Sequence, residues 1–386
     1  MIILGMLSIR NILDSDLASV SLPASMLLDP INDEVEVPTD PRHKVSRLME
    51  SFRQRAAQSY LDILRALCQN RCRIRRTLTH TLADWDNLQL DSEQVDEELR
   101  QHTKEQAMKL PDFGDMPTFA FPLSSWCYHY KLRQMQWLVQ MGFELDIYAH
   151  DERASMYWLL QNYAMTHYRH LQRISSFLIR DYAEMRKDSK AENPAMKGME
   201  FQNAINYIRL SSLQVTATQA LAHGTSCLYT VLERYKLIPL TPHPYSTDEI
   251  RYEQRMKPFL GISLPELLSY QQFNASVTQP EESSLELLEF AAASVAASKR
   301  EFEALSKLDT QTARCEGKWC DEAWHKNAKE EVKSCIAASI AIMTVKKAVE
   351  VAESTKAKEL KLSVECLPSE KSYHDWWVLP KVLAVK

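Results

Sequence analysis

The stretch from Arg42 to Leu110 lies between two prolines and contains neither glycine nor proline. Within it, apolar side chains recur every 3.6 residues on average from Val45 to Leu99, which is the period of one face of an α-helix. An unbroken helix of this length would run about 85–105 Å. A turn near residues 79–84 would instead fold the stretch into two antiparallel helices. In either form, the sequence predicts a long apolar stripe suited to packing other parts of the chain.

Charge divides the same stretch into two halves. Residues 42–76 hold ten Lys and Arg side chains against two acids, whereas residues 84–98 hold seven acids and no base. The basic run from Arg65 to Arg76, with Arg71, Arg73 and Arg75 at its centre, either meets RNA phosphate or an acidic partner, or pairs with carboxylates elsewhere in the chain. The acidic half is better explained as a solvated helix face.

Glycine is scarce, and this limits both the fold and the chemistry. The 386 residues include seven glycines, and no two of them are closer than 26 residues. Loops that cradle phosphate or coenzyme A need neighbouring glycines, because backbone N–H groups must approach the ligand closely. The chain therefore has no P-loop, no dinucleotide fingerprint and no acetyl-CoA loop. With 45% apolar residues and many good helix formers, it is predicted to be an all-α protein.

The expected architecture is a bundle or irregular α-solenoid of long helices, with a short C-terminal tail docked on it through Trp376, Trp377 and Val378. Three regions are expected: an N-terminal amphipathic piece and Pro-containing connector (1–41), a long-helix spine region (42–185) and a C-terminal helical region (195–386). Helices are predicted at about 124–141, 151–185, 195–237, 247–256, 281–308 and 321–357. Gly142 is expected to follow the first of these, and Gly224 is a candidate hinge in the third.

Composition also excludes several function classes. The net charge of −5 does not indicate a general nucleic-acid binder, and no direct DNA binding is expected. No signal peptide is evident, no apolar run approaches 18 residues, and the eight cysteines show no secreted framework. We therefore expect a cytoplasmic protein with reduced thiols and no membrane contact.

Candidate chemical sites are weak. The set Cys315, Cys320, His325 and Cys335 matches no standard zinc spacing, and His167 and His170 lie one helical turn apart without a third ligand in register. No G-x-S-x-G nucleophile elbow is present. The sequence therefore predicts no catalytic residue, no bound cofactor and no metal site.

Several segments resemble one known family. RALCQNRCRIRRTL, DWDNLQLDSEQVDEEL, GFELDIYAHDE, RYEQRMKPF and YHDWWVLPKVLAVK occur in this order. Together they resemble the large auxiliary subunit of the NatC N-terminal acetyltransferase complex, most closely its fungal branch, over residues 29–386. RYEQRMKPF resembles the signature of that family, with Gln254 where a histidine is usual. The matching signature residues are Arg251, Tyr252, Glu253, Arg255, Pro258 and Phe259.

The resemblance implies a non-catalytic scaffold that anchors a GNAT-fold catalytic subunit, works with an Sm-like small subunit and helps to position nascent-chain N-termini near the ribosome. It also implies that acetyl-CoA binds to the catalytic partner. Subunits of this family are about twice as long, and only their C-terminal half has a counterpart here. The alternative function is a helical ribosome-binding, RNA-binding or protein-interaction module that uses the run from Arg65 to Arg76. An enzyme in its own right is disfavoured.

Overall fold

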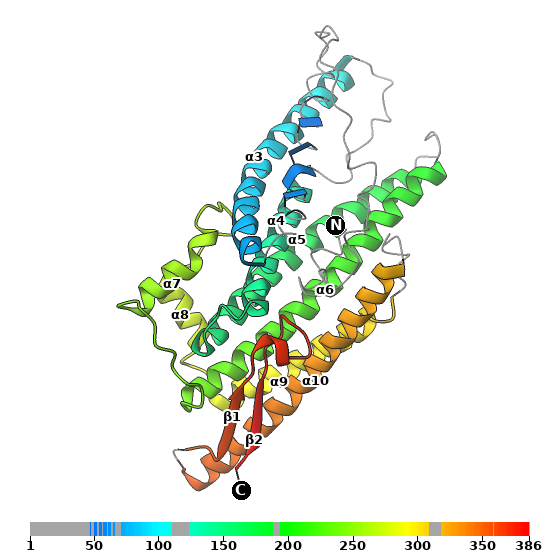
Figure 1. Cartoon of the computed structure of the whole chain (residues 1–386). Coiled ribbons are helices and arrows are strands. Elements are labelled where there is room, and N and C mark those ends of the chain that lie inside the picture. The colour runs from blue at the N-terminus through cyan, green and yellow to red at the C-terminus, as the bar shows by residue number, and fades with distance from the viewer. Residues whose placement is uncertain are drawn as a thin grey trace.

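The computed structural model describes residues 71–109, 123–187, 194–308, 318–357 and 359–385, together with scattered helical positions between 47 and 65. Six long helices lie side by side in an irregular stack (Figure 1). They are α3 (Arg71–Lys109), α4 (Leu123–Glu144), α5 (Arg153–Lys187), α6 (Pro194–Arg234), α9 (Ser284–Leu305) and α10 (Lys318–Thr355). Each packs on the next along the chain, so the prediction of long helices in an irregular solenoid is confirmed.

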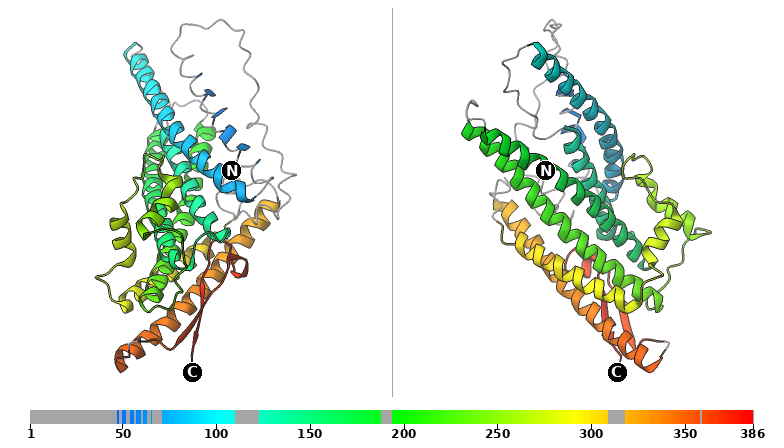
Figure 2. Two further views of the ribbon diagram at one scale, coloured as in Figure 1. Left: turned by 60° about the vertical axis from the view of Figure 1, so that its left-hand side comes forward. Right: turned by 180° about the vertical axis from the view of Figure 1, so that it is seen from behind.

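Shorter elements complete the described part of the chain. Four of them border the first turn of α5 or follow α6: η3 (His150–Glu152), α7 (Asp248–Met256), η4 (Lys257–Phe259) and α8 (Tyr270–Thr278). The C-terminal tail contains β1 (Leu362–Cys366), η6 (Ser369–Lys371) and β2 (Pro380–Ala384). Figure 2 shows the paired strands alongside α10, and α7 with α8 on the opposite side of the stack.

The predicted spine folds differently from both forms suggested by its sequence. Residues 79–84 lie inside α3, so a turn at that place is wrong. Arg55 nevertheless forms an ion pair with Asp91, 36 residues later. In one unbroken helix these residues would be about 54 Å apart. Arg55 and Asp91 therefore do not belong to one straight helix, and the apolar stripe of α3 packs against α4.

Both central glycines permit close approach of side chains or helices. Gly142 lies within the last turn of α4, and the left-handed position belongs to Asp146, with φ of 49°. A Cβ at Gly142 would lie 2.0 Å from the Tyr148 ring. A Cβ at Gly224 would lie 2.5 Å from a methyl group of Val295 on α9. Since α6 runs through Gly224 without a break, a hinge at this residue is wrong.

Helix α8 and the strands β1 and β2 have no counterpart in the sequence prediction. Helix α8 lies between Pro265 and Pro280, where no element is expected; Ser269 caps it, in a reciprocal pair with Gln272. The tail docks as predicted, with Trp376, Trp377 and Val378 buried, but it also forms an antiparallel pair of five-residue strands, β1 and β2. Thirteen residues separate these strands along the chain, and no tight-turn signal joins them. Among the described helices, none is long and apolar enough to cross a membrane.

Candidate functional site

The two segments with the least generic sequences, 142–152 and 251–259, meet in the fold. Arg251 donates to both carboxylate oxygens of Asp151, at 2.8 and 3.1 Å. Arg255 donates to Glu152 through Nε at 2.8 Å and through a terminal nitrogen at 2.7 Å. The four side chains are only 10–20% exposed. We call this set (Asp151, Glu152, Arg251 and Arg255) the signature junction; it joins positions 100 or more residues apart.

Local sequence explains this arrangement. The Thr247 side chain accepts a hydrogen bond from the backbone N–H of Ile250 and so fixes the start of α7. Arg251 and Arg255 are four residues apart on that helix and therefore share a face. The two acids directly precede α5, where the helix dipole favours negative charge. The backbone N–H of Ala149 also donates to Glu152, at 3.0 Å.

The electrostatics keep the junction charged. Burial opposes ionisation of Asp151, but the hydrogen bonds and charge of Arg251 outweigh it, so the pKa of Asp151 is lowered. Burial likewise opposes the charge of Arg251, and its two acidic partners outweigh that effect and raise its pKa. With these charges mutually paired, the junction acts as a structural clamp and offers no group suited to proton transfer at neutral pH.

The other residues of the predicted signature pack the short helices together. The Tyr252 hydroxyl donates to the carbonyl of Leu268 at 2.7 Å, and its ring lies 4.7 Å from that of Phe273 on α8. Phe259 is buried, 5.4 Å from the ring of Tyr163. Pro258 lies in η4. Glu253 is exposed, so it is the one signature residue that does not hold the segment in place.

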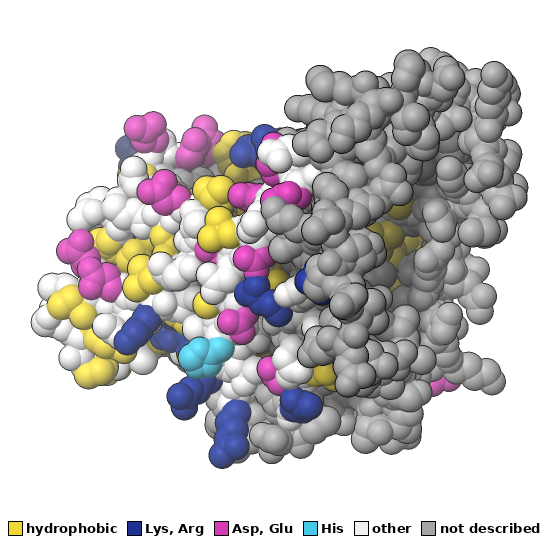
Figure 3. Space-filling model, turned by 90° about the horizontal axis from the view of Figure 1, so that it is seen from above, with side chains coloured by type: hydrophobic (Ala, Val, Ile, Leu, Met, Phe, Trp, Pro, Cys, Tyr) yellow, Lys and Arg dark blue, Asp and Glu magenta, His cyan; other side chains and the backbone are white. Residues whose placement is uncertain are grey.

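Among the described residues of the basic run, Arg75 lies near this site, where its charge and that of Arg255 both act on Tyr148. Arg65 is exposed and pairs with Asp62, and Arg73 is exposed at the start of α3. Burial raises the pKa of Tyr148 to about 12, against the opposing positive charges of Arg75 and Arg255. Arg71 begins α3, and its side chain lies outside the described part. Figure 3 shows acidic and basic side chains together on the described area of one face, with neither sign dominating it.

The sequence analysis expected the acidic half of the spine to be a solvated helix face, but two of its acids are buried. Asp86 is buried and accepts from Lys131 at 2.7 Å. Asp96 is also buried and accepts from the backbone N–H groups of Leu123 and Ser124, at 2.9 and 3.0 Å. It therefore caps α4 from a neighbouring helix. Both acids directly follow an apolar position of the stripe, which is the signal that identifies them.

The histidines of the predicted weak metal pair serve separate contacts. His167 is buried, 2.8 Å from His129 and 2.8 Å from Gln136, and His129 lies 2.6 Å from the Tyr207 hydroxyl. Burial lowers the pKa of His129 and of His167 well below the usual value. His170 bonds instead to the carbonyl of Ser125. The network links α4, α5 and α6.

The structure describes only part of the cysteine set. Cys335 is buried against Ser298 on α9, 3.6 Å away, while Cys315 and the side chain of Cys320 lie outside the described residues. Within the described ranges, no group of three or more His, Cys, Asp or Glu side chains is placed to hold a metal ion.

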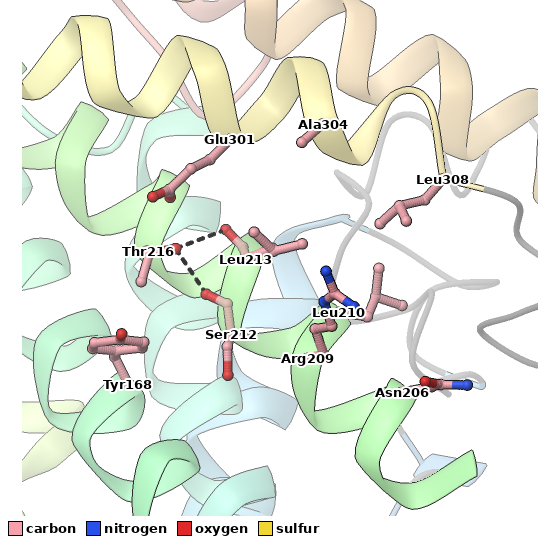
Figure 4. A pocket seen from close by; sticks show the side chains of 10 residues that line it. All are labelled: Tyr168, Asn206, Arg209, Leu210, Ser212, Leu213, Thr216, Glu301, Ala304 and Leu308. Atoms are coloured by element: carbon pink, nitrogen blue, oxygen red, sulfur yellow. Dashed lines mark hydrogen bonds between the residues drawn. The ribbon is translucent and has the colours of Figure 1, made fainter. Parts of the chain in front are cut away.

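Two cavities adjoin these elements. The larger, which we call the junction cleft, has a volume of about 750 Å³ and is bounded by η3, α5, the end of α6, α7 and α8. The second, of about 520 Å³, lies between α5, α6 and α9, where Tyr168, Thr216 and Glu301 face it (Figure 4). The Thr216 hydroxyl bonds to carbonyls of its own helix, at 2.9 and 3.1 Å. Burial raises the pKa of Glu301.

Stacked antiparallel helices, braced by short elements and a docked tail, define a helical-repeat scaffold protein. A comparison with family models identifies it more closely. The chain belongs to the NAA35-like, TPR-repeat family, whose model matches residues 3–379.

Individual relatives agree with this assignment. The Homo sapiens "N-alpha-acetyltransferase 35, NatC auxiliary subunit" is 24% identical over 236 residues, which cover 60% of this chain and 31% of the relative. Its Saccharomyces cerevisiae counterpart is 22% identical over 250 residues, covering 58% and 30%. The matches thus span about one third of the length of these relatives.

Solved structures share the fold over a longer stretch. A chain of the apo NatC complex superposes with a TM-score of 0.68 at 17% identity, covering 89% of this chain and 50% of that chain. A chain of the NatC complex bound to Gag peptide and CoA gives a TM-score of 0.67 at 18% identity, covering 91% and 49%. The fold of this chain therefore corresponds to about half of those chains.

Proposed function

We propose that this protein is a non-catalytic auxiliary subunit of a NatC-like N-terminal acetyltransferase, which anchors the catalytic subunit and helps to position nascent-chain N-termini. The observation that carries the proposal is the family match over residues 3–379. The fold likeness to chains of solved NatC complexes supports it. One of those complexes is bound to Gag peptide and CoA.

The surface of the stack is suited to holding another polypeptide. Helix α10 exposes Ile336, Ile340 and Met343, at a spacing of four and three residues that places them on one face. The segment after α6 exposes Leu240 and Leu260. Contiguous exposed apolar side chains of this kind are typical of protein interfaces, where burying them drives association.

The remaining partners follow from the same proposal. The catalytic subunit has a GNAT fold and carries acetyl-CoA, an Sm-like small subunit completes the assembly, and the assembly works in the cytoplasm beside the ribosome. The absence of closely spaced glycines in this chain supports the placement of acetyl-CoA on the catalytic subunit.

Co-expression tests the proposal. The tagged chain is expressed with the catalytic and small subunits of the same organism, purified by its tag and analysed by size-exclusion chromatography. We expect the catalytic subunit to co-elute, and the complex to acetylate a peptide that begins with Met and a bulky apolar residue faster than the catalytic subunit alone. The variants Ile340→Glu and Leu260→Glu show which of the two exposed apolar surfaces contributes to binding of the catalytic subunit. If the catalytic subunit elutes separately and its rate is unchanged, the proposal is wrong.

A second candidate function is ribosome or RNA binding through the basic run. The observation that favours it is the exposure of Arg73 and Arg76, one turn apart at the start of α3. Binding of this kind weakens steeply with salt. Charge reversal at both arginines should then abolish sedimentation with ribosomes at low salt, and unchanged sedimentation would exclude this candidate.

A further inference from the structure

The junction cleft carries one more acidic group than basic groups. Its lining includes four carboxyl groups (Asp151, Glu152, Glu233 and Asp248) and three basic groups (Lys236, Arg251 and Arg255). Two of the acids are matched by the two arginines of the signature junction. Asp248 lies 3.4 Å from His243 and is otherwise largely exposed to solvent. The fourth acid, Glu233, forms no ion pair within the described part of the chain.

Glu233 lies in the last turn of α6, on the wall of the cleft. Its Oε1 atom is buried and accepts no hydrogen bond. Burial, with the negative charge of Asp151 added, raises the pKa of Glu233 to about 8. The carbonyl end of a helix also disfavours a negative charge. A carboxylate oxygen buried without a partner is costly, and a cation beside it would remove that cost.

The rest of the lining suits a flexible aliphatic stem. Met156, Ile238, Met256 and Val277 contribute apolar surface to the cleft, and Leu240 lies exposed at its rim. Lysine carries four methylene groups that pack on such surface while its ammonium group reaches a polar partner. A single free carboxylate oxygen suits this compact ammonium better than the planar fork of arginine, which prefers two acceptors.

We propose that the junction cleft receives a lysine side chain projecting from a partner polypeptide, with its stem on the apolar wall and its ammonium group paired with Glu233. Charge complementarity selects this occupant, since one positive charge balances the lining once Glu233 is ionised. The inference goes beyond the proposed function, because the site is defined by this chain alone.

Binding is coupled to a proton. A cation favours the ionised form of Glu233, so the carboxyl group releases its proton as the ammonium enters. Affinity should therefore increase with pH up to about 8 and then level off. The other charged groups around the cleft are Asp151 and Glu152 of η3, Lys236 after α6, and Asp248, Arg251 and Arg255 of α7.

The first test uses n-butylamine, which has the stem and ammonium group of lysine, and the full chain labelled at its methionine methyl groups. We expect shifts of the Met156 and Met256 signals in NMR spectra, with those of the remote, buried Met135 unmoved. Affinity should fall at least tenfold in Glu233→Gln and stay unchanged in Glu253→Gln, a matched substitution at an exposed position. Butan-1-ol, which lacks the charge, should bind at least tenfold more weakly than the amine.

Three results of this titration would overturn the proposal: equal binding of butan-1-ol, unchanged affinity in folded Glu233→Gln, or shifts confined to other methionines. A fourth is a tenfold gain in affinity in Lys236→Gln, because the chain's own Lys236 would then be the occupant. These results require no acetyltransferase assembly, so they are independent of the proposed function.

The second test identifies the source of the lysine. A carbodiimide couples carboxyl groups directly to amines that touch them, so treatment of the co-expressed assembly should join Glu233 to a lysine of a partner chain. Mass spectrometry should detect this cross-link. Glu233→Gln should remove this cross-link and leave the other cross-links in place. A cross-link only to Lys236, or none at Glu233 while other cross-links between subunits form, would contradict a partner lysine.

Discussion

The signature junction and the docked tail fasten distant segments to the same helix by different means. At the junction, two arginines of α7 pair with Asp151 and Glu152, just before α5. In the tail, Trp377 is fully buried, with its ring 5.8 Å from that of Tyr157, one turn into α5. The Tyr157 hydroxyl accepts from the backbone N–H of Val378 at 2.7 Å.

This difference shows how each segment should respond to conditions. Charge pairs at 10–20% exposure are weakened by salt and by protonation of the acids. Buried aromatic surface is insensitive to salt screening and contributes more free energy for each side chain. The tail should therefore account for more of the stability, whereas the junction should be the contact that opens first in salt.

Truncation of the tail anchor should have the largest effect. Trp377→Ala removes a fully buried indole from the stack with Tyr157 and should lower the free energy of unfolding by about 3–5 kcal/mol. Urea denaturation followed by circular dichroism measures it. Tyr373→Ala, in the same tail but 59% exposed, is the control and should change stability by less than about 0.5 kcal/mol. Equal losses in the two variants would mean that the tail is not anchored by burial.

Acid should destabilise the tail at a higher pH than the junction. His374 is buried, its Nε2 donates to Oδ1 of Asn327 at 2.8 Å, and burial lowers its pKa to about 3. The unfolded chain binds a proton near pH 6.5 and the folded chain does not, so stability falls as pH drops below 6.5. At pH 5 this one group costs on the order of 2 kcal/mol.

The measurement compares urea denaturation at pH 7 and pH 5. His374→Gln should lose stability at pH 7 through its altered hydrogen bonds, but should show a smaller further loss at pH 5 than the unaltered chain. His129 and His167 shift in the same direction, so both proteins retain part of the acid effect. The Asp151 contribution persists to lower pH, because its pKa is lowered and its stabilisation is lost only as pH falls through that value. An identical pH dependence in the two proteins would exclude His374 as a source.

Periodicity predicted the long helices well and their ends less well. The helix predicted to end near Met141 runs to Glu144, because Gly142 is needed to admit the Tyr148 ring and the left-handed turn falls at Asp146. The sequence alone cannot distinguish a glycine that makes room for a neighbouring ring from a glycine that ends a helix in a left-handed turn. Likewise, Gly224 marks a close helix crossing, since the contact with Val295 joins residues 71 positions apart.

The contacts that build the candidate site were less accessible to sequence reasoning. The resemblance identified Arg251 and Arg255 as signature residues, but their partners, Asp151 and Glu152, lie about 100 residues away and no spacing rule connects them. Glu233 carries no sequence signal, because its importance lies in the absence of a partner in the folded chain. Burial of Asp86 and Asp96 could have been inferred from their positions beside the apolar stripe.

Loss of one junction pair should have a smaller effect than either change in the tail. Arg255→Gln removes two charged hydrogen bonds from Glu152 and should cost about 1.5 kcal/mol. In 1 M NaCl the difference from the unaltered chain should shrink, because salt screens the pair that only the unaltered chain has. Lys257→Gln, at an exposed position just after α7, is the control and should be neutral. A loss in Arg255→Gln that does not change with salt would show that its stem packing, not its charge, holds the segment.

The smallest expected effect concerns the cap that orients the junction. Thr247→Ala removes the acceptor for the backbone N–H of Ile250 and should cost about 1 kcal/mol, while Thr247→Ser keeps the hydroxyl and should cost less. Because α7 presents both junction arginines, its loosening should appear as faster amide hydrogen exchange in residues 248–259, with exchange in the tail unchanged. Faster exchange in both regions would mean that the junction and the tail open together, and that their separation into a charged contact and an apolar contact does not extend to their dynamics.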